Sequence, residues 1–136
     1  MEERFRFCQK AFIRKDDKVL ILKTSRNDPS PGKWEVAGGA VEFGEDLDKS
    51  LKREVEEETG LVFEKGKYIC VVSSIYSYMG KVFNGISVFY ECEYLDGEVR
   101  LSSEHIEHKW IKPSEYVNFD VIEVFKVAFE KYLEKI

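Results

Sequence analysis

Three glutamates, Glu54, Glu57 and Glu58, fall close together in the first half of the chain. On a helix, residues three and four positions apart are neighbours, so these like charges destabilise the helix unless something neutralises them. A divalent cation would do so. Hard ions such as Mg²⁺, or Mn²⁺ in its place, bind carboxylate oxygens together with the phosphates of a substrate. The cluster therefore predicts a magnesium site for a phosphorylated small molecule.

The direction of these side chains separates a metal site from an ordinary acidic surface. An acidic run is usually a solvated helix face. At 3.6 residues per turn, however, Glu54 and Glu58 fall on or within the apolar stripe of the expected helix, and Glu57 flanks it. That stripe consists of Leu47, Leu51 and Val55. Carboxylates that face a core are costly to desolvate unless they are paired or bind metal, so the spacing favours the metal site.

The helix that must carry these glutamates is expected over 45–59. Acidic residues at Glu45 and Asp46 suit a helix start, and Gly60 suits the end. Before the helix, Gly38 and Gly39 allow a close backbone approach or a positive φ. The segment 24–33 contains two prolines and a glycine and is a long loop, which makes it a candidate for function.

The remaining elements follow from apolar patterning and turn residues. Strands are expected at 5–13 and 19–22, forming a hairpin, and at 34–36, 41–43, 61–76, 82–94 and 109–112. Turns are expected at 78–81 and 95–98, and a helical turn at 113–116. The segment 119–136 has the spacing of an amphipathic helix whose apolar face packs in the core. The pattern predicts a mixed sheet with two main helices.

Composition limits the class of protein. A chain of 136 residues with 43% hydrophobic content fits one domain over residues 1–136. The net charge of −5 argues against a nucleic-acid backbone as partner, although not against a small polyphosphate neutralised by metal. Cys8, Cys70 and Cys92 lie apart in apolar segments and are expected to be buried thiols of a cytoplasmic protein. No stretch is long and apolar enough to span a membrane.

One segment resembles a known family motif. Gly39, Glu45, the run Arg53-Glu54-Val55, the pair Glu57-Glu58 and the pair Gly60-Leu61 stand at the spacing of a complete Nudix box. The flanking segments 31–35 and 104–110 are similar to those of MutT-like Nudix hydrolases. One departure is Ala37, where many relatives carry proline. The resemblance implies an α+β fold, an α/β/α sandwich with a mixed sheet between the box helix and a C-terminal helix.

The resemblance also implies roles inside the box. Glu54, Glu57, Glu58 and the backbone carbonyl of Gly38 would bind the metal ions. Glu54 is the first choice for the general base, with Glu57 or Glu58 as alternatives. Arg53 would orient Glu54, although an ordinary salt bridge would look the same. Glu45 is expected to be structural support, because acidic residues favour the first turn of a helix for dipole reasons alone.

Outside the box the assignments carry alternatives. Glu104 and Glu107 are expected in a loop before Trp110, where relatives often place a further catalytic or metal-binding carboxylate; the alternative is two exposed, idle side chains. His105 and His108 have a spacing that suggests zinc, but they lack a nearby thiol or helix, so they are interpreted as surface histidines.

Substrate contacts are the least determined part of the site. Arg26 and Lys33 flank the long loop and are candidates for phosphate contacts, with solvated cations as the alternative. Aromatic and amide side chains downstream are candidates for stacking or hydrogen bonding, with core packing as the alternative. They are Tyr76, Tyr78, Phe83, Asn118 and Phe119.

The resemblance implies Mg²⁺-dependent hydrolysis of a nucleoside diphosphate linked to a further group. A nucleoside triphosphate giving monophosphate and pyrophosphate is the first choice, by a monomer or homodimer. ADP-ribose, oxidised nucleotides and nucleotide sugars are alternatives. Tyr76 and Tyr78 leave dinucleoside polyphosphates open. A non-catalytic nucleotide-binding module is a rival of another class, which the complete set of box carboxylates disfavours.

Overall fold

The computed structural model describes residues 2–136. Its strands are β1 (Glu2–Lys15), β2 (Lys18–Thr24), β3 (Trp34–Glu35), β4 (Ala37–Ala40), β5 (Val62–Tyr78), β6 (Lys81–Asp96) and β7 (His105–Ile111). Its helices are α1 (Leu47–Thr59), the 3-10 helix η1 (Pro113–Asn118) and α2 (Glu123–Glu134). No helix within residues 2–136 is long and apolar enough to cross a membrane.

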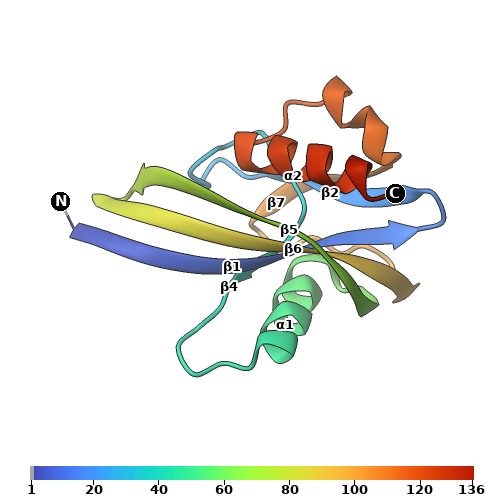
Figure 1. The fold of residues 1–136 in the computed structure, drawn as a ribbon, viewed down its shortest axis with the longest axis horizontal. Helices are drawn as coiled ribbons and strands as arrows, with labels where there is room; N and C mark the ends of the chain where they lie inside the picture. Colours follow the sequence, from blue (N-terminus) through green and yellow to red (C-terminus); the bar gives the residue numbers. More distant parts are fainter. Residues whose placement is uncertain (1) are drawn as a thin grey trace.

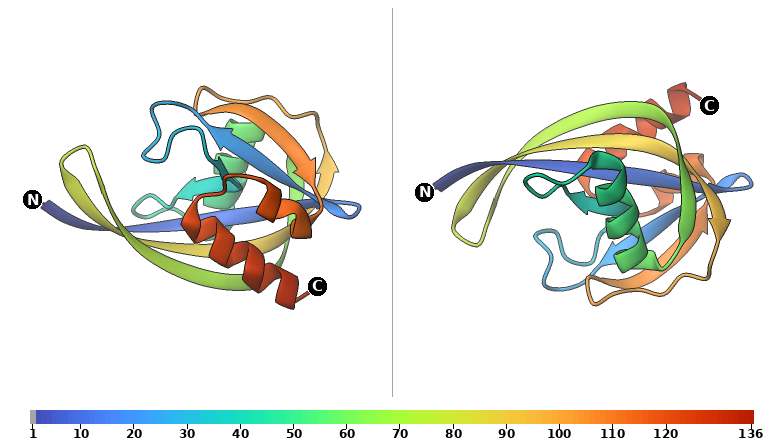
Figure 2. Two further views of the ribbon diagram at one scale, coloured as in Figure 1. Left: turned by 90° about the horizontal axis from the view of Figure 1, so that it is seen from above. Right: turned by 90° about the horizontal axis from the view of Figure 1, so that it is seen from below.

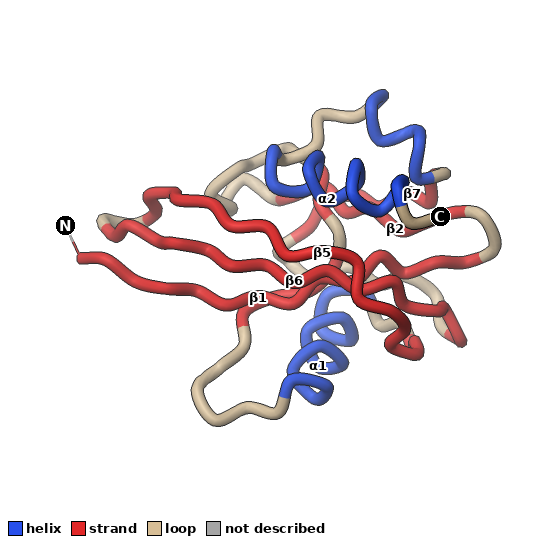
Figure 3. Tube along the Cα trace, in the orientation of Figure 1, coloured by secondary structure: helices blue, strands red, loops and turns tan. Residues whose placement is uncertain are grey.

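The strands form one mixed, strongly curled sheet with the two main helices on opposite sides (Figure 1). β1 pairs in parallel with β6 along one edge, and its other edge pairs antiparallel with β4 and, at its end, with β2. β2 continues the sheet to β3 and β7, and β5 pairs with β6. The secondary-structure view shows the layers clearly (Figure 3), and the predicted α/β/α sandwich is confirmed.

Two apolar clusters fill the layers. Alternate residues of β1 face opposite sides of the sheet, so Phe12 packs under α2 while Ala11 and Ile13 pack under α1. α1 contributes Leu51 and Val55 to its cluster. α2 contributes Phe125, Ala128, Phe129 and Tyr132, which confirms the predicted core-facing stripe.

The N-terminal half of β1 and the hairpin of β5 and β6 extend beyond both helices (Figure 2). On this extension the two strands paired to β6 lie in register, with Cys8 opposite Ser87 and Ser74 opposite Gly85. Residues that pair directly share a face of the sheet. The face on the α2 side therefore carries small and polar side chains where no helix covers it.

The local structure corrects several predicted boundaries. Residues 41–43 do not form a strand, because β4 ends at Ala40 and the chain turns away toward α1. α1 begins at Leu47, since Asp46 caps it by accepting a hydrogen bond from the backbone N–H of Lys49. The segment 119–122 precedes α2 instead of belonging to it, and β7 starts at His105, earlier than expected.

The three cysteines are free thiols. Cys70 and Cys92 are buried, as predicted. Cys8 is only partly buried, because the extension of β1 leaves one face of the sheet uncovered.

Candidate active site

A cavity of about 540 Å³ opens between the uncovered sheet face, the C-terminal half of α1 and the start of α2. The sheet extension and β4 provide Arg6, Cys8, Lys10, Gly38, Gly39, Ala40, Ser74, Tyr76 and Ser87. The loops, β3 and the start of β7 provide Asp28, Pro29, Ser30, Glu35, Glu42, Glu104 and His105. The helices provide Glu54 and Glu58 from α1, with Ile122 to Phe125 at the start of α2. A cavity of this volume accommodates a small organic ligand.

Glu58 is the most enclosed carboxylate of the cavity. The residue is 5% exposed, and its Oε1 accepts a hydrogen bond of 2.8 Å from the backbone N–H of Gly38. Burial raises the pKa of Glu58 well above its ordinary value, because the charged form loses its water. Lys10 opposes this effect without cancelling it. A cation bound beside Glu58 would therefore stabilise its ionised form.

Glu54 lies one turn earlier and packs against β4. A Cβ at Gly39 would overlap the Glu54 carboxylate as it stands, so a side chain there would displace Glu54. Burial raises the pKa of Glu54, and the negative charge of Glu57 adds to this, while Arg53 opposes it. A glycine at this point of β4 therefore lets the α1 carboxylate reach the cavity.

Arg53 connects the acidic residues at both ends of α1. Its Nε donates to Glu45 Oε2 at 2.8 Å, and its Nη1 lies 3.1 Å from Glu54 Oε1 and 3.4 Å from Glu57 Oε2. The hydrogen bond from Arg53 lowers the pKa of Glu45 to about 2. The guanidinium thus contacts Glu45, Glu54 and Glu57 at the same time.

Lys10, Glu35 and His105 form a second polar group beside Glu58. Lys10 Nζ donates to the Gly38 carbonyl at 3.2 Å and lies 3.9 Å from Glu35 Oε1. Glu35 Oε2 lies 2.8 Å from His105 Nε2. Burial by itself would raise the pKa of Glu35, but Lys10 and His105 outweigh it and hold that pKa below its ordinary value.

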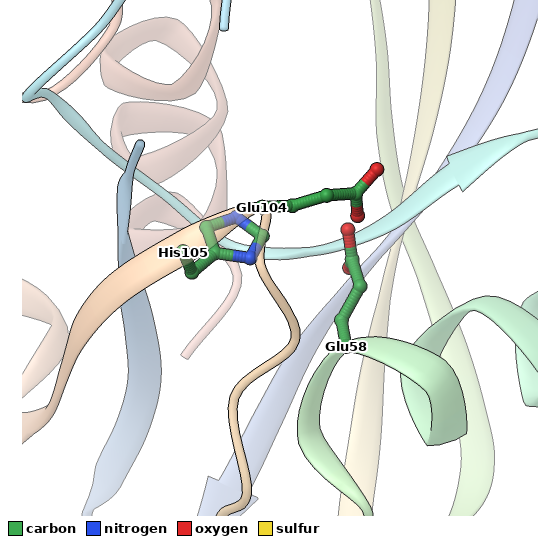
Figure 4. Close-up of side chains that lie close together, drawn as sticks. All are labelled: Glu58, Glu104 and His105. Carbon is green, nitrogen blue, oxygen red and sulfur yellow. The ribbon is translucent and has the colours of Figure 1, made fainter. Parts of the chain in front are cut away.

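The donor set fits a divalent cation. Glu58, Glu104 and His105 each offer one ligand atom, and these atoms lie within 4.8 Å of one another. Figure 4 shows the two carboxylates approaching each other with the imidazole ring beside them. Glu54 adds a further carboxylate to the same cavity. Because clustered carboxylates repel each other and Glu58 is buried, a cation between them is favourable.

The structure places the two glutamates that were predicted to lie before Trp110 in different positions. Glu104 lies in the turn before β7 and lines the cavity. Glu107 was expected in a loop, but it lies within β7, exposed, 4.0 Å from Lys109 Nζ. His108 is exposed as predicted, whereas His105 is buried with 5% exposure, so its interpretation as a surface histidine was wrong. His105 is the first residue of β7 and pairs with Thr24 of β2, which is also buried.

The predicted substrate residues mostly lie elsewhere. Tyr76 lines the cavity and stacks on Phe83, with ring centroids 5.3 Å apart. The described residues that line the cavity do not include the exposed Arg26, Lys33 and Asn118. Tyr78 is also absent from that lining, and its hydroxyl donates to the Asn27 carbonyl at 2.7 Å. Phe119 packs on Trp34 in the core. Glu57, which was predicted to bind metal, has a side chain that is 58% exposed.

Sequence reasoning missed Arg6, Lys10 and Glu35. A signal existed for two of them, since Lys10 directly precedes the apolar run 11–13 and Glu35 stands between Trp34 and Val36. An ionisable residue inside an apolar strand is rarely buried without a partner, so each suggested the other. Arg6 carried no such signal, because the N-terminal half of β1 alternates apolar and charged residues like any half-exposed strand.

A carboxylate-lined cavity beside a curled mixed sheet held between two helices can bind a divalent cation together with a phosphorylated small molecule. The NUDIX domain family model matches residues 9–131. The chain belongs to the Nudix family and is a pyrophosphohydrolase of small nucleotides. Members of this family generally use divalent metal ions.

Known proteins resemble the chain over most of its length. It is 28% identical over 117 residues to the nucleoside triphosphatase NudI of Escherichia coli K12, which covers 80% of this chain and 83% of that protein. The MutT protein from Methanosarcina mazei Go1 has a TM-score of 0.85 and 28% identity, covering 99% of this chain and 97% of its own. A MutT Nudix hydrolase from Burkholderia pseudomallei has a TM-score of 0.78 and 26% identity, covering 93% and 97%.

Proposed function

We propose that this protein hydrolyses nucleoside triphosphates to monophosphates and pyrophosphate with Mg²⁺, for which Mn²⁺ can substitute. The observation that carries the proposal is the convergence of Glu54, Glu58 and Glu104 on a cavity whose other wall holds Arg6 and Tyr76. Similarity to a nucleoside triphosphatase over 80% of the chain supports the choice of substrate.

The metal would be held by carboxylates and one carbonyl. Glu54, Glu58 and Glu104 line the cavity, and the carbonyl of Gly38 lies beside them, where it already accepts a hydrogen bond from Lys10. Glu57, on the exposed side of Glu54, would complete the set. Bound divalent cations neutralise phosphate oxygens and orient the polyphosphate for attack by water.

Hydrolysis adds water to one phosphorus and breaks the bridging phosphorus–oxygen bond, so one proton must leave the water. Glu54 is the proposed acceptor. Its carboxylate faces the cavity, and Arg53 fixes it at 3.1 Å. The raised pKa that burial gives Glu54 makes it a better base than a solvated glutamate. Arg53 is a positioning residue, since Glu45 and Glu57 occupy its other donors.

The opposite wall suits the nucleoside. Arg6 lies 3.5 Å from the Tyr76 hydroxyl, and Tyr76 presents an aromatic ring that Phe83 supports from behind. Base stacking on such a ring contributes about 1 to 3 kcal/mol per base. The hydroxyls of Ser74 and Ser87 lie on the same wall and can hydrogen-bond with polar groups of a base or ribose.

The test is a substrate panel with product identification. Nucleoside triphosphates, oxidised deoxynucleotides, ADP-ribose, dinucleoside polyphosphates and nucleotide sugars are incubated with the protein and Mg²⁺. We expect the highest kcat/KM for a nucleoside triphosphate, with monophosphate and pyrophosphate as products. A higher value for another class would replace the substrate. Micromolar binding of a nucleotide with no hydrolysis of any compound would favour the non-catalytic module.

A further inference from the structure

We propose that His105 binds a divalent metal through Nδ1, together with Glu58 and Glu104, and that this position prefers a transition metal such as Mn²⁺, Co²⁺ or Zn²⁺ to Mg²⁺. The inference deepens the proposed function, because it concerns the same cavity. It can nevertheless fail or succeed separately, because its test measures the metal's ligands and not hydrolysis.

The imidazole of His105 has one nitrogen without a partner. Its side chain is 1% exposed, and Nδ1 is enclosed with no hydrogen-bond partner among the described residues. A buried polar atom without a hydrogen-bond partner destabilises the folded state. A strand that turns such a side chain inward, beside two carboxylates, leaves a site in which a ligand would remove that destabilisation (Figure 4).

The other ring nitrogen decides which tautomer is present. Nε2 lies 2.8 Å from Glu35 Oε2. An ionised carboxylate only accepts hydrogen bonds, and Glu35 also lies 3.9 Å from the ammonium of Lys10. Nε2 therefore carries the hydrogen. In the neutral ring, Nδ1 then has a free lone pair, which is the form that coordinates metal.

Glu35, His105 and a metal would make a common arrangement. Histidines that bind metal almost always donate their second ring N–H to a carboxylate or carbonyl, which fixes the ring and makes the bare nitrogen more basic. Glu35 occupies that place here. Glu35 is thus a positioning residue for the metal site.

The distances suit a shared ion. The ligand atoms of Glu58, Glu104 and His105 lie within 4.8 Å of one another. Metal–nitrogen and metal–oxygen bonds are about 2.0 to 2.2 Å, so two ligands on opposite sides of one ion are separated by about 4.4 Å at most. Three ligands of one ion cannot all lie opposite one another, so the group must close further around an ion, and the exposed side chain of Glu104 can supply that movement.

The donor types set the metal preference. Mg²⁺ prefers oxygen ligands and keeps several waters. Imidazole nitrogen suits Zn²⁺, Ni²⁺, Cu²⁺ and iron, and affinity for mixed nitrogen and oxygen sites rises from Mn²⁺ toward Cu²⁺. The His105 position has two oxygens and one nitrogen, whereas Glu54 offers only oxygen. The cavity therefore combines one oxygen-only position with one position that discriminates among metals.

The rival interpretation is a hydrogen-bonding histidine of the core. A doubly protonated ring would donate from both nitrogens and pair with the carboxylates as a cation, without coordination. Electron spin-echo measurements on the Mn²⁺-loaded wild-type protein distinguish the two. We expect nitrogen modulation from a directly bound imidazole, which changes when histidine is labelled with ¹⁵N.

Variants locate that nitrogen. His105→Gln is expected to abolish the modulation and to weaken Co²⁺ binding, measured by calorimetry, by about 10- to 100-fold, with a much smaller change for Mg²⁺. Glu35→Gln should weaken Co²⁺ binding in the same direction. His108→Gln is the matched control, since His108 is exposed on the same strand, and it should leave both measurements unchanged.

Bound Mn²⁺ without nitrogen modulation in the wild type would overturn the inference, and so would equal Co²⁺ affinity in folded His105→Gln. The wild-type experiment decides the question even if the variant does not fold. Nitrogen coordination in a protein that hydrolyses no nucleotide would contradict the proposed function while supporting the metal ligand.

Discussion

Glu54, Glu57 and Glu58 are neighbours in sequence but occupy three different environments. Glu58 is buried against the Gly38 amide, Glu54 faces the cavity beside Arg53, and Glu57 is largely exposed. The pKa of the first two is raised by burial. The three glutamates therefore differ in chemistry although they carry the same side chain, since dehydration makes a carboxylate both a stronger base and a stronger metal ligand.

Replacing the box carboxylates with glutamine tests these environments. We expect Glu54→Gln to lower kcat by at least about 100-fold, because a positioned base or ligand contributes on that scale. Glu57→Gln is expected to lower kcat by a similar factor, because Glu57 is a proposed metal ligand. Glu56→Gln, exposed on the opposite face, is the control. Full activity in Glu54→Gln would remove it from the site, and full activity in Glu57→Gln would restrict the site to the cavity.

At the scale of elements, the short strand β4 makes room for the side chains of the site. Its two glycines lie between β1 and α1, and each avoids a different steric clash. Gly38 has a φ of 135° and no room for a Cβ beside the Gln9 backbone. Gly39 gives its space to the Glu54 side chain. β4 thus lets α1 approach the sheet.

These two glycines predict opposite phenotypes. Gly38→Ala meets rigid backbone in a strained conformation and should destabilise the fold by about 2 to 5 kcal/mol. Gly39→Ala meets the end of a flexible side chain, so stability should change by less than about 1 kcal/mol while kcat falls as Glu54 is displaced. Urea unfolding and steady-state kinetics measure the two effects. Equal stability losses in both variants would contradict this division.

α2 stabilises the sheet face that carries the site without lining most of the cavity. Phe129 is fully buried, with its ring 5.0 Å from Phe12 and 5.2 Å from Tyr116. Phe129→Ala should therefore cost about 3 to 5 kcal/mol, seen as a lower urea midpoint. Turnover per folded molecule should stay close to wild type at low temperature. A large fall in turnover without a stability change would indicate that α2 acts directly on the site.

At the scale of the whole molecule, buried charge concentrates in one place. Lys10, Glu35, Glu58 and His105 lie together where the sheet, α1 and β7 meet. Lys10 and Glu35 satisfy each other, but Glu58 bears a charge with incomplete compensation. The buried charge of Glu58 therefore destabilises the folded protein, and a bound cation can reduce this destabilisation.

This destabilisation makes stability depend on pH and metal together. A carboxyl with a raised folded-state pKa favours folding while protonated; this contribution is present below its ordinary value of 4.5 and is lost as pH rises through the folded value. Metal-free protein should thus lose stability from Glu58 as pH rises above about 4.5. A cation at 100 times its Kd stabilises the fold by about 2.7 kcal/mol. At a fixed metal concentration this stabilisation should grow as pH rises, because the metal binds the deprotonated carboxylate.

Thermal unfolding in EDTA and in Mg²⁺, at about pH 6 and about pH 8, measures the effect. Glu58→Gln should stabilise the metal-free protein at the higher pH and reduce the response to metal, because its amide oxygen can still accept from Gly38. Glu56→Gln should behave like wild type. A metal response that grows as pH falls would contradict the role of Glu58.

The sequence by itself determined the helix α1 and the carboxylates that it carries. Helical spacing places Glu54 and Glu58 on the core-facing stripe, and the capping residues Asp46 and Gly60 set its ends. These are local properties, fixed by the period of one element and by backbone preferences of single residues. The box motif covers the same local stretch, and for this reason the family could be inferred before the fold was known.

Only the tertiary structure decided which distant residues join that helix. Lys10, Glu35 and His105 come from three strands, and their meeting depends on register and on the curl of the sheet. Sequence spacing does not encode those relations, since a shift of one residue would turn each side chain to the other face. Three neighbouring carboxylates could be identified from one helix, but their buried partners exist only where separate strands meet.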